Sequence, residues 1–330
     1  SQMSRQLELR KLDHLAVTFD HRLDPLLLPD ETIKELLGNF EYLENTVLLA
    51  SPDEMESTSI EYRRCLSDSG QNSIENVARL YALHEVRSFS GGQSVTIDDA
   101  FLMPSEAEQC DANDLAEIES LQRALQTLFG VDLRSKIEVS FDVNLAHRVH
   151  KLVMPNAQDA GNFRTCDAAP RDSTFQYLNW EQIPAELEVL FNYCSEQSMT
   201  TRNRGDAFKL AAVFLERFLL IHPYRDGNGR TSRLLCSVLL MQMDCMKVPL
   251  LFNFDKRRNS SGSMTLCRDQ YMSALQGARG AIASDTVPPN LLAAFLVLVG
   301  DRTLRSWSDL LVVGTERQRH RSSSHKEDEQ

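Results

Sequence analysis

A short polar segment, IHPYRDGNGRTSR at residues 221–233, separates two apolar stretches of the chain. Its histidine, His222, has a side-chain pKa suited to accepting a proton near neutral pH. Asp226 supplies a hard oxygen ligand, of the kind that Mg²⁺ takes when it bridges phosphates. Arg230 and Arg233 are three residues apart, so in a helix they share one face and can grip phosphate oxygens. The segment therefore predicts a site for nucleotide phosphates, a metal ion and a base that activates a hydroxyl nucleophile.

Gly227, Asn228 and Gly229 form the turn of this segment. A residue that precedes proline leaves the α region, so the upstream helix is expected to end before Pro223. Glycine costs about 1 kcal/mol in a helix interior, which leaves the turn irregular until a new helix starts near Arg230. A glycine-rich turn that feeds a helix N-terminus points several free N–H groups at one place, where an anion can bind. A plain helical corner would explain any one of these residues, but not all of them at this spacing.

Helices are predicted on both sides of the turn because apolar residues recur there every three or four positions. Upstream, Leu210, Val213, Phe214 and Phe218 follow this spacing, and Leu234, Leu235, Val238 and Leu239 follow it downstream. Residues 159–184 differ, since short mixed segments and turn residues favour an extended flap or a small hairpin. The predicted fold class is all-α with one small β element. The other helices are expected over 31–49, 76–89, 115–128, 184–197, 206–221, 271–277 and 291–299, with one more that stops at Pro155.

Charge and cysteine content limit the class of protein. The chain has 330 residues with 35 Lys plus Arg and 47 Asp plus Glu, a net charge of −12. This balance argues against nucleic acid or an anionic membrane as a partner. The apolar runs are too short to span a bilayer. Seven cysteines without CxxC pairs are typical of reduced thiols, so we expect a cytoplasmic protein.

The polar segment resembles the signature of the Fic family, H-x-F-x-[D/E]-G-N-G-R-x-x-R, with Tyr224 where phenylalanine is usual. An aromatic residue there anchors the loop, and a tyrosine serves if its hydroxyl finds a partner. The segments AGNFR and FQYLNWEQIP resemble the family's flap, and DQYMSAL resembles its later helix. Together the resemblance covers roughly Ala50 to Leu298. It implies a Fic-type helical bundle with a β-hairpin flap, with an N-terminal helical region over 1–90 and a catalytic core over 91–313. The polar composition of residues 314–330 predicts a disordered tail.

The resemblance also implies an activity, the transfer of AMP from ATP to a Ser, Thr or Tyr hydroxyl of a target protein. His222 would be the catalytic base, and Asp226 would hold Mg²⁺. The α- and β-phosphates would be cradled by Gly227, Asn228 and Gly229 through backbone and amide donors. Arg230 would neutralise phosphate charge and Arg233 would hold the γ-phosphate. The flap residues Gln176, Tyr177 and Leu178 would pin the target segment by strand-like pairing.

Two alternatives to AMP transfer from ATP stay open: a nucleotide-binding regulator without transfer, and a transferase that uses another donor such as UTP or CDP-choline. The oligomeric state is open as well.

Many members of the family restrain themselves with a helix that bears [S/T]-x-x-x-E-[G/N]. Two segments compete for that role: STSIEY favours Glu61, in a helix expected over about 51–66, and QNSIEN offers Glu75 as the alternative. In the first segment Ser57 stands four residues before Glu61, so the two share a helix face. The glutamate would pair with Arg233 and block the γ-phosphate. It could also position a water, which leaves removal of AMP from a modified protein as a second activity.

Overall fold

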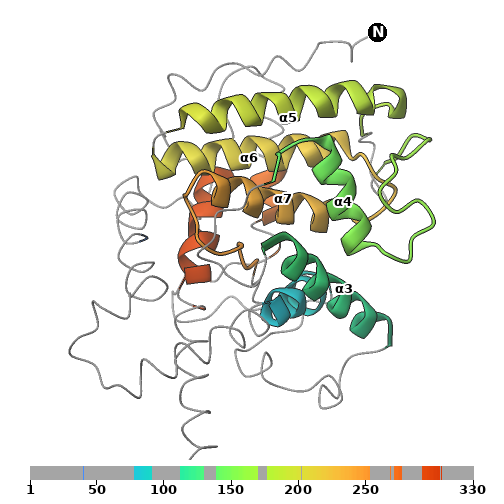
Figure 1. Cartoon of the computed structure of the whole chain (residues 1–330), viewed down its shortest axis with the longest axis horizontal. Helices are drawn as coiled ribbons and strands as arrows, with labels where there is room; N and C mark the ends of the chain where they lie inside the picture. Colours follow the sequence, from blue (N-terminus) through green and yellow to red (C-terminus); the bar gives the residue numbers. More distant parts are fainter. Residues whose placement is uncertain are drawn as a thin grey trace, which may run out of the picture.

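The computed structural model of the chain describes residues 78–90, 112–129, 139–169, 177–201, 203–252, 271–276 and 292–304, together with residues 40, 268 and 306. Three long helices form its centre: α5 (Ile183–Thr200), α6 (Arg204–Ile221) and α7 (Asn228–Gln242). α6 lies between α5 and α7 and is buried along almost its whole length (Figure 1). Its start is set by Asn203, whose side-chain oxygen accepts the N–H of Asp206 at 2.9 Å as an N-cap.

A second group of helices packs against α7 from the side. α4 (Val143–Val153) contacts both α7 and α3 (Ala112–Phe129), and α3 in turn contacts η1 (His84–Ser90), a π-helical continuation of the helix over 78–83 (Figure 1). Asp142 caps α4 by accepting the N–H of Leu145 at 2.8 Å. The short η4 (Trp180–Gln182) leads into α5, and helical segments over 271–276 and 292–304 complete the described part.

Aromatic side chains hold the central helices together. Phe214 of α6 contacts Phe141, Phe191 and Phe218 with ring centroids 5.2–5.6 Å apart. All four rings are buried. Edge-to-face and tilted aromatic pairs at this spacing are worth about 0.5–1.5 kcal/mol each beyond their burial. The core thus fixes the C-terminal end of α6, where the polar segment begins.

The predicted all-α class is confirmed, and the helices expected over 115–128, 184–197 and 206–221 correspond to α3, α5 and α6. The β-hairpin is not shown, because the described residues contain no strand. The two arms of the flap do meet, since the N–H of Tyr177 donates to the carbonyl of Ala168 at 3.1 Å. Residues 170–176, the helix expected over 51–66 and the tail over 314–330 lie outside the described residues. In the part that the structure describes, no helix is both long and apolar enough to cross a membrane.

Candidate active site

His222 sits at the C-terminal end of α6 in a left-handed backbone conformation, with φ 51° and ψ 59°. Its N–H still donates to the carbonyl of Phe218 at 2.9 Å, so the helix ends at this residue. A left-handed non-glycine residue costs roughly 1–2 kcal/mol, which indicates that the surroundings hold it there. The ring of Tyr177 stacks on the imidazole at a centroid distance of 3.8 Å and an interplanar angle of 12°. One face of the predicted base is therefore covered by the flap.

Asn228 shapes the loop from within. Its side-chain oxygen accepts the N–H of Tyr224 at 2.9 Å, and its amide nitrogen donates to the carbonyl of Tyr224 at 2.7 Å. The side chain is buried. One N–H of this amide is thus engaged by the loop itself, and the donation of Asn228 to a phosphate stays a prediction. The free N–H groups of the first turn of α7 remain available for an anion.

Tyr224 anchors the loop to α4, as its position in the signature predicts. Its ring is fully buried and stacks on His150 at 3.8 Å with an interplanar angle of 9°. Its hydroxyl lies 3.4 Å from Nδ1 of His147. The hydroxyl that replaces the usual phenylalanine hydrogen thus has a polar neighbour.

His150 fixes the loop from the α4 side. Its Nδ1 accepts the N–H of Gly161 at 2.8 Å, which places the ring proton on Nε2. Nε2 in turn lies 3.0 Å from the main-chain oxygen of Asp226, to which it donates. Burial lowers the pKa of His150 and outweighs the raising effect of the Asp226 carbonyl and of nearby carboxylates. The neutral ring is therefore the form that the loop requires. No feature of the sequence distinguished this histidine from an ordinary core residue.

Gly227 and Gly229 both have side chains of neighbouring residues close to their Cα positions. Gly227 is left-handed, with φ 74°, and a Cβ there would lie 2.6 Å from Cγ of Met154. A Cβ on Gly229 would lie 3.0 Å from Nη1 of Arg233. The turn thus brings its backbone against the arginine predicted to hold a phosphate.

Asp226 is exposed at the mouth of the loop, and its Oδ1 accepts the N–H of Gly227 at 2.6 Å. Among the described residues, no group of three or more His, Cys, Asp or Glu side chains could hold a metal by itself. A single accessible carboxylate fits Mg²⁺ only when phosphate oxygens and waters supply the other ligands. The arrangement is thus compatible with a metal that arrives with a nucleotide.

Arg233 is engaged by Glu85 of η1. Nε of Arg233 donates to Oε1 of Glu85 at 2.7 Å, and Nη2 donates to Oε2. Arg233 is 2% exposed and Glu85 1%. Burial alone would lower the pKa of Arg233, but the carboxylate charge and hydrogen bond of Glu85 outweigh it and raise that pKa. Phe252 adds a ring 5.7 Å from the guanidinium carbon.

Arg230 is paired in a similar way. Its Nη1 forms an ion pair with Glu117 of α3, and its Nη2 lies 3.2 Å from the sulfur of Met154. Both members of this pair are partly exposed. The two arginines predicted to bind phosphate are therefore each held by a carboxylate from a different helix.

Glu61 and Glu75 lie outside the described residues, so the structure places neither of them. The place on Arg233 that was predicted for Glu61 is taken by Glu85. Sequence reasoning missed Glu85 because Tyr81 and Val86 stand where the inhibitory pattern has Ser or Thr and Gly or Asn. Both residues are buried, so Glu85 belongs to a helix of the core and not to the segment over about 51–66 where the inhibitory helix was expected.

The structure describes two of the three predicted flap residues. Tyr177 and Leu178 are described and lie beside the end of α6, whereas Gln176 lies outside the described residues.

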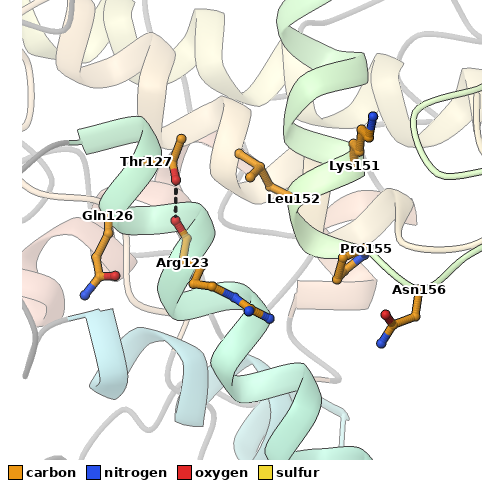
Figure 2. Close-up of a pocket in the computed structure, with 7 residues that line it drawn as sticks. All are labelled: Arg123, Gln126, Thr127, Lys151, Leu152, Pro155 and Asn156. Carbon is orange, nitrogen blue, oxygen red and sulfur yellow. Dashed lines mark hydrogen bonds between the residues drawn. The ribbon is translucent and has the colours of Figure 1, made fainter.

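A separate hollow of about 530 Å³ lies between α3 and α4, and no residue of the segment from His222 to Arg233 lines it (Figure 2). Its lining consists of Arg123, Gln126, Thr127, Lys151, Leu152, Pro155 and Asn156. It is therefore not the candidate active site.

The described residues thus form a helical fold in which a histidine, a glycine-rich turn and two arginines lie at the junction of α6 and α7. Residues 140–240 match the Fic/DOC family, and this match supports a Fic-type domain in that region. Protein adenylyltransferase fic-1 of Caenorhabditis elegans is 26% identical over 170 residues, which cover 49% of this chain and 32% of that protein. Protein adenylyltransferase VbhT of Bartonella schoenbuchensis is 25% identical over 122 residues, 36% of this chain and 25% of that protein. The chain thus spans about a third or less of these relatives.

Solved structures agree on the fold. Fic-1 of C. elegans (residues 134–508) superposes with a TM-score of 0.54 at 17% identity, covering 85% of this chain and 72% of the other. A Fic domain containing signaling protein from Bacteroides thetaiotaomicron gives a TM-score of 0.55 at 16% identity, covering 86% of this chain and 98% of the other. These likenesses establish the fold over more of the chain than the family match alone.

Proposed function

We propose that the protein transfers AMP from ATP to a hydroxyl of a protein target, and that Glu85 restrains this transfer in the resting state. The observation that carries the proposal is the site itself. A histidine, an acidic residue, a glycine-rich helix start and two arginines meet at one loop, and each fills a distinct role in nucleotide chemistry. The adenylyltransferase names of the relatives support the same reaction class.

In the proposed reaction His222 accepts the proton of the target hydroxyl, which then attacks the α-phosphorus of ATP. The bond from that phosphorus to the bridging oxygen breaks, and pyrophosphate leaves with the electron pair. The N–H groups at the start of α7 stabilise the charge on the phosphate oxygens. Asp226 would hold Mg²⁺, which neutralises charge on the leaving group.

The restraint follows from competition for one guanidinium. Glu85 takes the Nε and Nη2 donors of Arg233 with both oxygens and neutralises its charge, so a γ-phosphate would have to compete with it. A nucleotide bound beside this pair would place its α-phosphate out of line with the attacking hydroxyl. Glu117 would compete with phosphate for Arg230 as well, but more weakly, because the ion pair of Glu117 and Arg230 is partly exposed to solvent.

The test uses ATP labelled at one phosphate at a time. The Glu85→Gly protein is incubated with ATP and Mg²⁺, and protein-bound label is measured. AMP transfer predicts that label on the α-phosphate enters protein and label on the γ-phosphate does not. Label from the γ-position alone would identify a kinase, and label from neither would favour a regulator that only binds nucleotide. Parallel reactions with UTP and CDP-choline decide whether ATP is the preferred donor.

A further inference from the structure

Arg164 lies outside the His222–Arg233 segment, yet it is hydrogen-bonded to the start of that segment. It is 3% exposed and comes from the AGNFR segment that leads into the flap. Its guanidinium donates only to main-chain carbonyl oxygens. The acceptors are Cys166 at 2.7 Å, His222 at 2.8 Å, Ile221 at 3.3 Å and Leu178. One side chain thus touches the flap on both of its arms and the end of α6.

These bonds complete the end of α6. The last carbonyl groups of a helix lack intrahelical partners and need donors from elsewhere. The carbonyl of Leu220 receives the N–H of Leu178 at 3.4 Å, and the carbonyl of Ile221 receives Nη2 of Arg164. A positive guanidinium at this end also complements the helix dipole. The flap segment therefore supplies the cap of the helix that carries the base.

The same side chain holds the strained backbone of His222. The side-chain Nε of Arg164 donates to the carbonyl of His222, and the backbone N–H of Arg164 donates to the carbonyl of Pro223 at 2.9 Å. The peptide groups on both sides of Pro223 are thus fixed from one residue. A left-handed non-glycine conformation persists only where the surroundings over-determine it.

We propose that Arg164 is a positioning residue that locks the flap and His222 into one rigid unit. The inference rests on the proposed function, since it concerns how the base and the target hydroxyl are held relative to each other. The flap would present the target segment, and Tyr177 lies against the imidazole that must reach it. If the flap and the loop moved independently, misplacement by about 1 Å would cost on the order of 10²-fold in rate.

Lysine cannot replace this arginine. The four carbonyl oxygens lie around a planar fork, and a lysine ammonium is a single point with three donors at the end of a flexible stem. Arg164→Lys therefore keeps the charge and loses the geometry. A matched control is Arg217→Lys, the same change at a second buried arginine. Arg217 lies on α6, where its Nε is 3.6 Å from Oε2 of Glu216, so this ion pair stays within the helix.

The experiment measures hydrogen exchange of the flap peptide and AMP transfer in the Glu85→Gly background. For Arg164→Lys we expect the amides of Tyr177 and Leu178 to exchange at least about tenfold faster than in the parent. We expect kcat to fall by about 10²-fold while the Kd for ATP stays within about threefold. Arg217→Lys should leave flap exchange as in the parent.

Unchanged flap exchange in Arg164→Lys would overturn the proposal, as would an equal acceleration in Arg217→Lys. Retained kcat with accelerated exchange would also overturn it, because the flap would then be loose without consequence for the base. If the Glu85→Gly parent transferred no AMP at all, the proposed function would fail. The exchange measurement would still decide whether Arg164 couples the flap to the loop, since it needs no activity.

Discussion

Glu85 and Arg233, 148 residues apart in the sequence, form a two-point ion pair inside the core at the mouth of the signature loop. The pair joins the π-helical η1 to the first turns of α7. π-helical segments are rare and often mark functional sites. Because Glu85 takes the Nε and Nη2 donors of Arg233 and neutralises its charge, we expect this contact to compete with a bound γ-phosphate.

Replacing Glu85 by glycine should raise self-modification by labelled ATP on the order of 10²-fold, since the α-phosphate can then reach its in-line position. The change also leaves Arg233 buried without a counter-charge, which should lower the free energy of unfolding by about 3–5 kcal/mol. ATP with Mg²⁺ should therefore raise the melting temperature of the variant more than that of the parent. Glu61→Gly and Glu75→Gly are assayed beside it, and activation by either of them without Glu85→Gly would move the restraint to that residue.

Glu117→Gln should tighten ATP binding only slightly, by about two- to fivefold, because exposed or partly exposed ion pairs are worth up to about 1 kcal/mol. The neutral amide keeps the size of the side chain and frees the Arg230 guanidinium for phosphate. Titration calorimetry on the parent and the variant measures the change. Weaker binding in the variant would mean that Glu117 supports the site and does not compete with the nucleotide.

Asp226→Ala should abolish the dependence of ATP binding on Mg²⁺ together with transfer. One carboxylate beside phosphate oxygens is an ordinary Mg²⁺ site, and its loss leaves the metal with no protein ligand there. The measurement is the Kd for ATP by calorimetry across a series of Mg²⁺ concentrations. Unchanged Mg²⁺ coupling in the variant would place the metal ligand at another residue.

His150 makes the stability of the loop depend on pH. Burial lowers its folded pKa below the ordinary value of about 6.5, so the unfolded chain takes up its proton first as pH falls. The stabilisation is fully present above about pH 6.5 and is lost as pH falls through the folded pKa. In that window the parent should lose up to about 1.4 kcal/mol of unfolding free energy per pH unit more than His150→Gln. Denaturant unfolding at several pH values tests this. If the unfolding free energies of the parent and of His150→Gln changed equally with pH, His150 would not be the source of the pH dependence.

The helices could be predicted from sequence because α3, α5 and α6 have regular apolar spacing and clear boundary residues. The position of the loop between two helices could be predicted from its proline and glycines, whereas the catalytic and phosphate-binding roles assigned to its residues stay predictions. The contacts of Asn228 with the backbone of Tyr224 could not be predicted, since an amide gives no sign of whether it faces a ligand or its own backbone. The partners of the arginines were missed because Glu85 and Glu117 reach the loop through tertiary packing, which spacing along the chain does not encode. Removal of AMP, the use of another donor and the cytoplasmic location stay predictions.

The central claim is that His222 is the base of an AMP transfer, and one comparison tests it most directly. The Glu85→Gly protein and the Glu85→Gly, His222→Ala protein are each measured for the single-turnover rate of AMP transfer and for the Kd for ATP. A positioned base contributes about 10²–10⁴-fold, so the rate should fall by that factor in the double variant. The phosphate contacts come from other residues, so the Kd for ATP should change by no more than about threefold. A double variant that retained most of the transfer rate would contradict the account, because the hydroxyl would then be activated without His222.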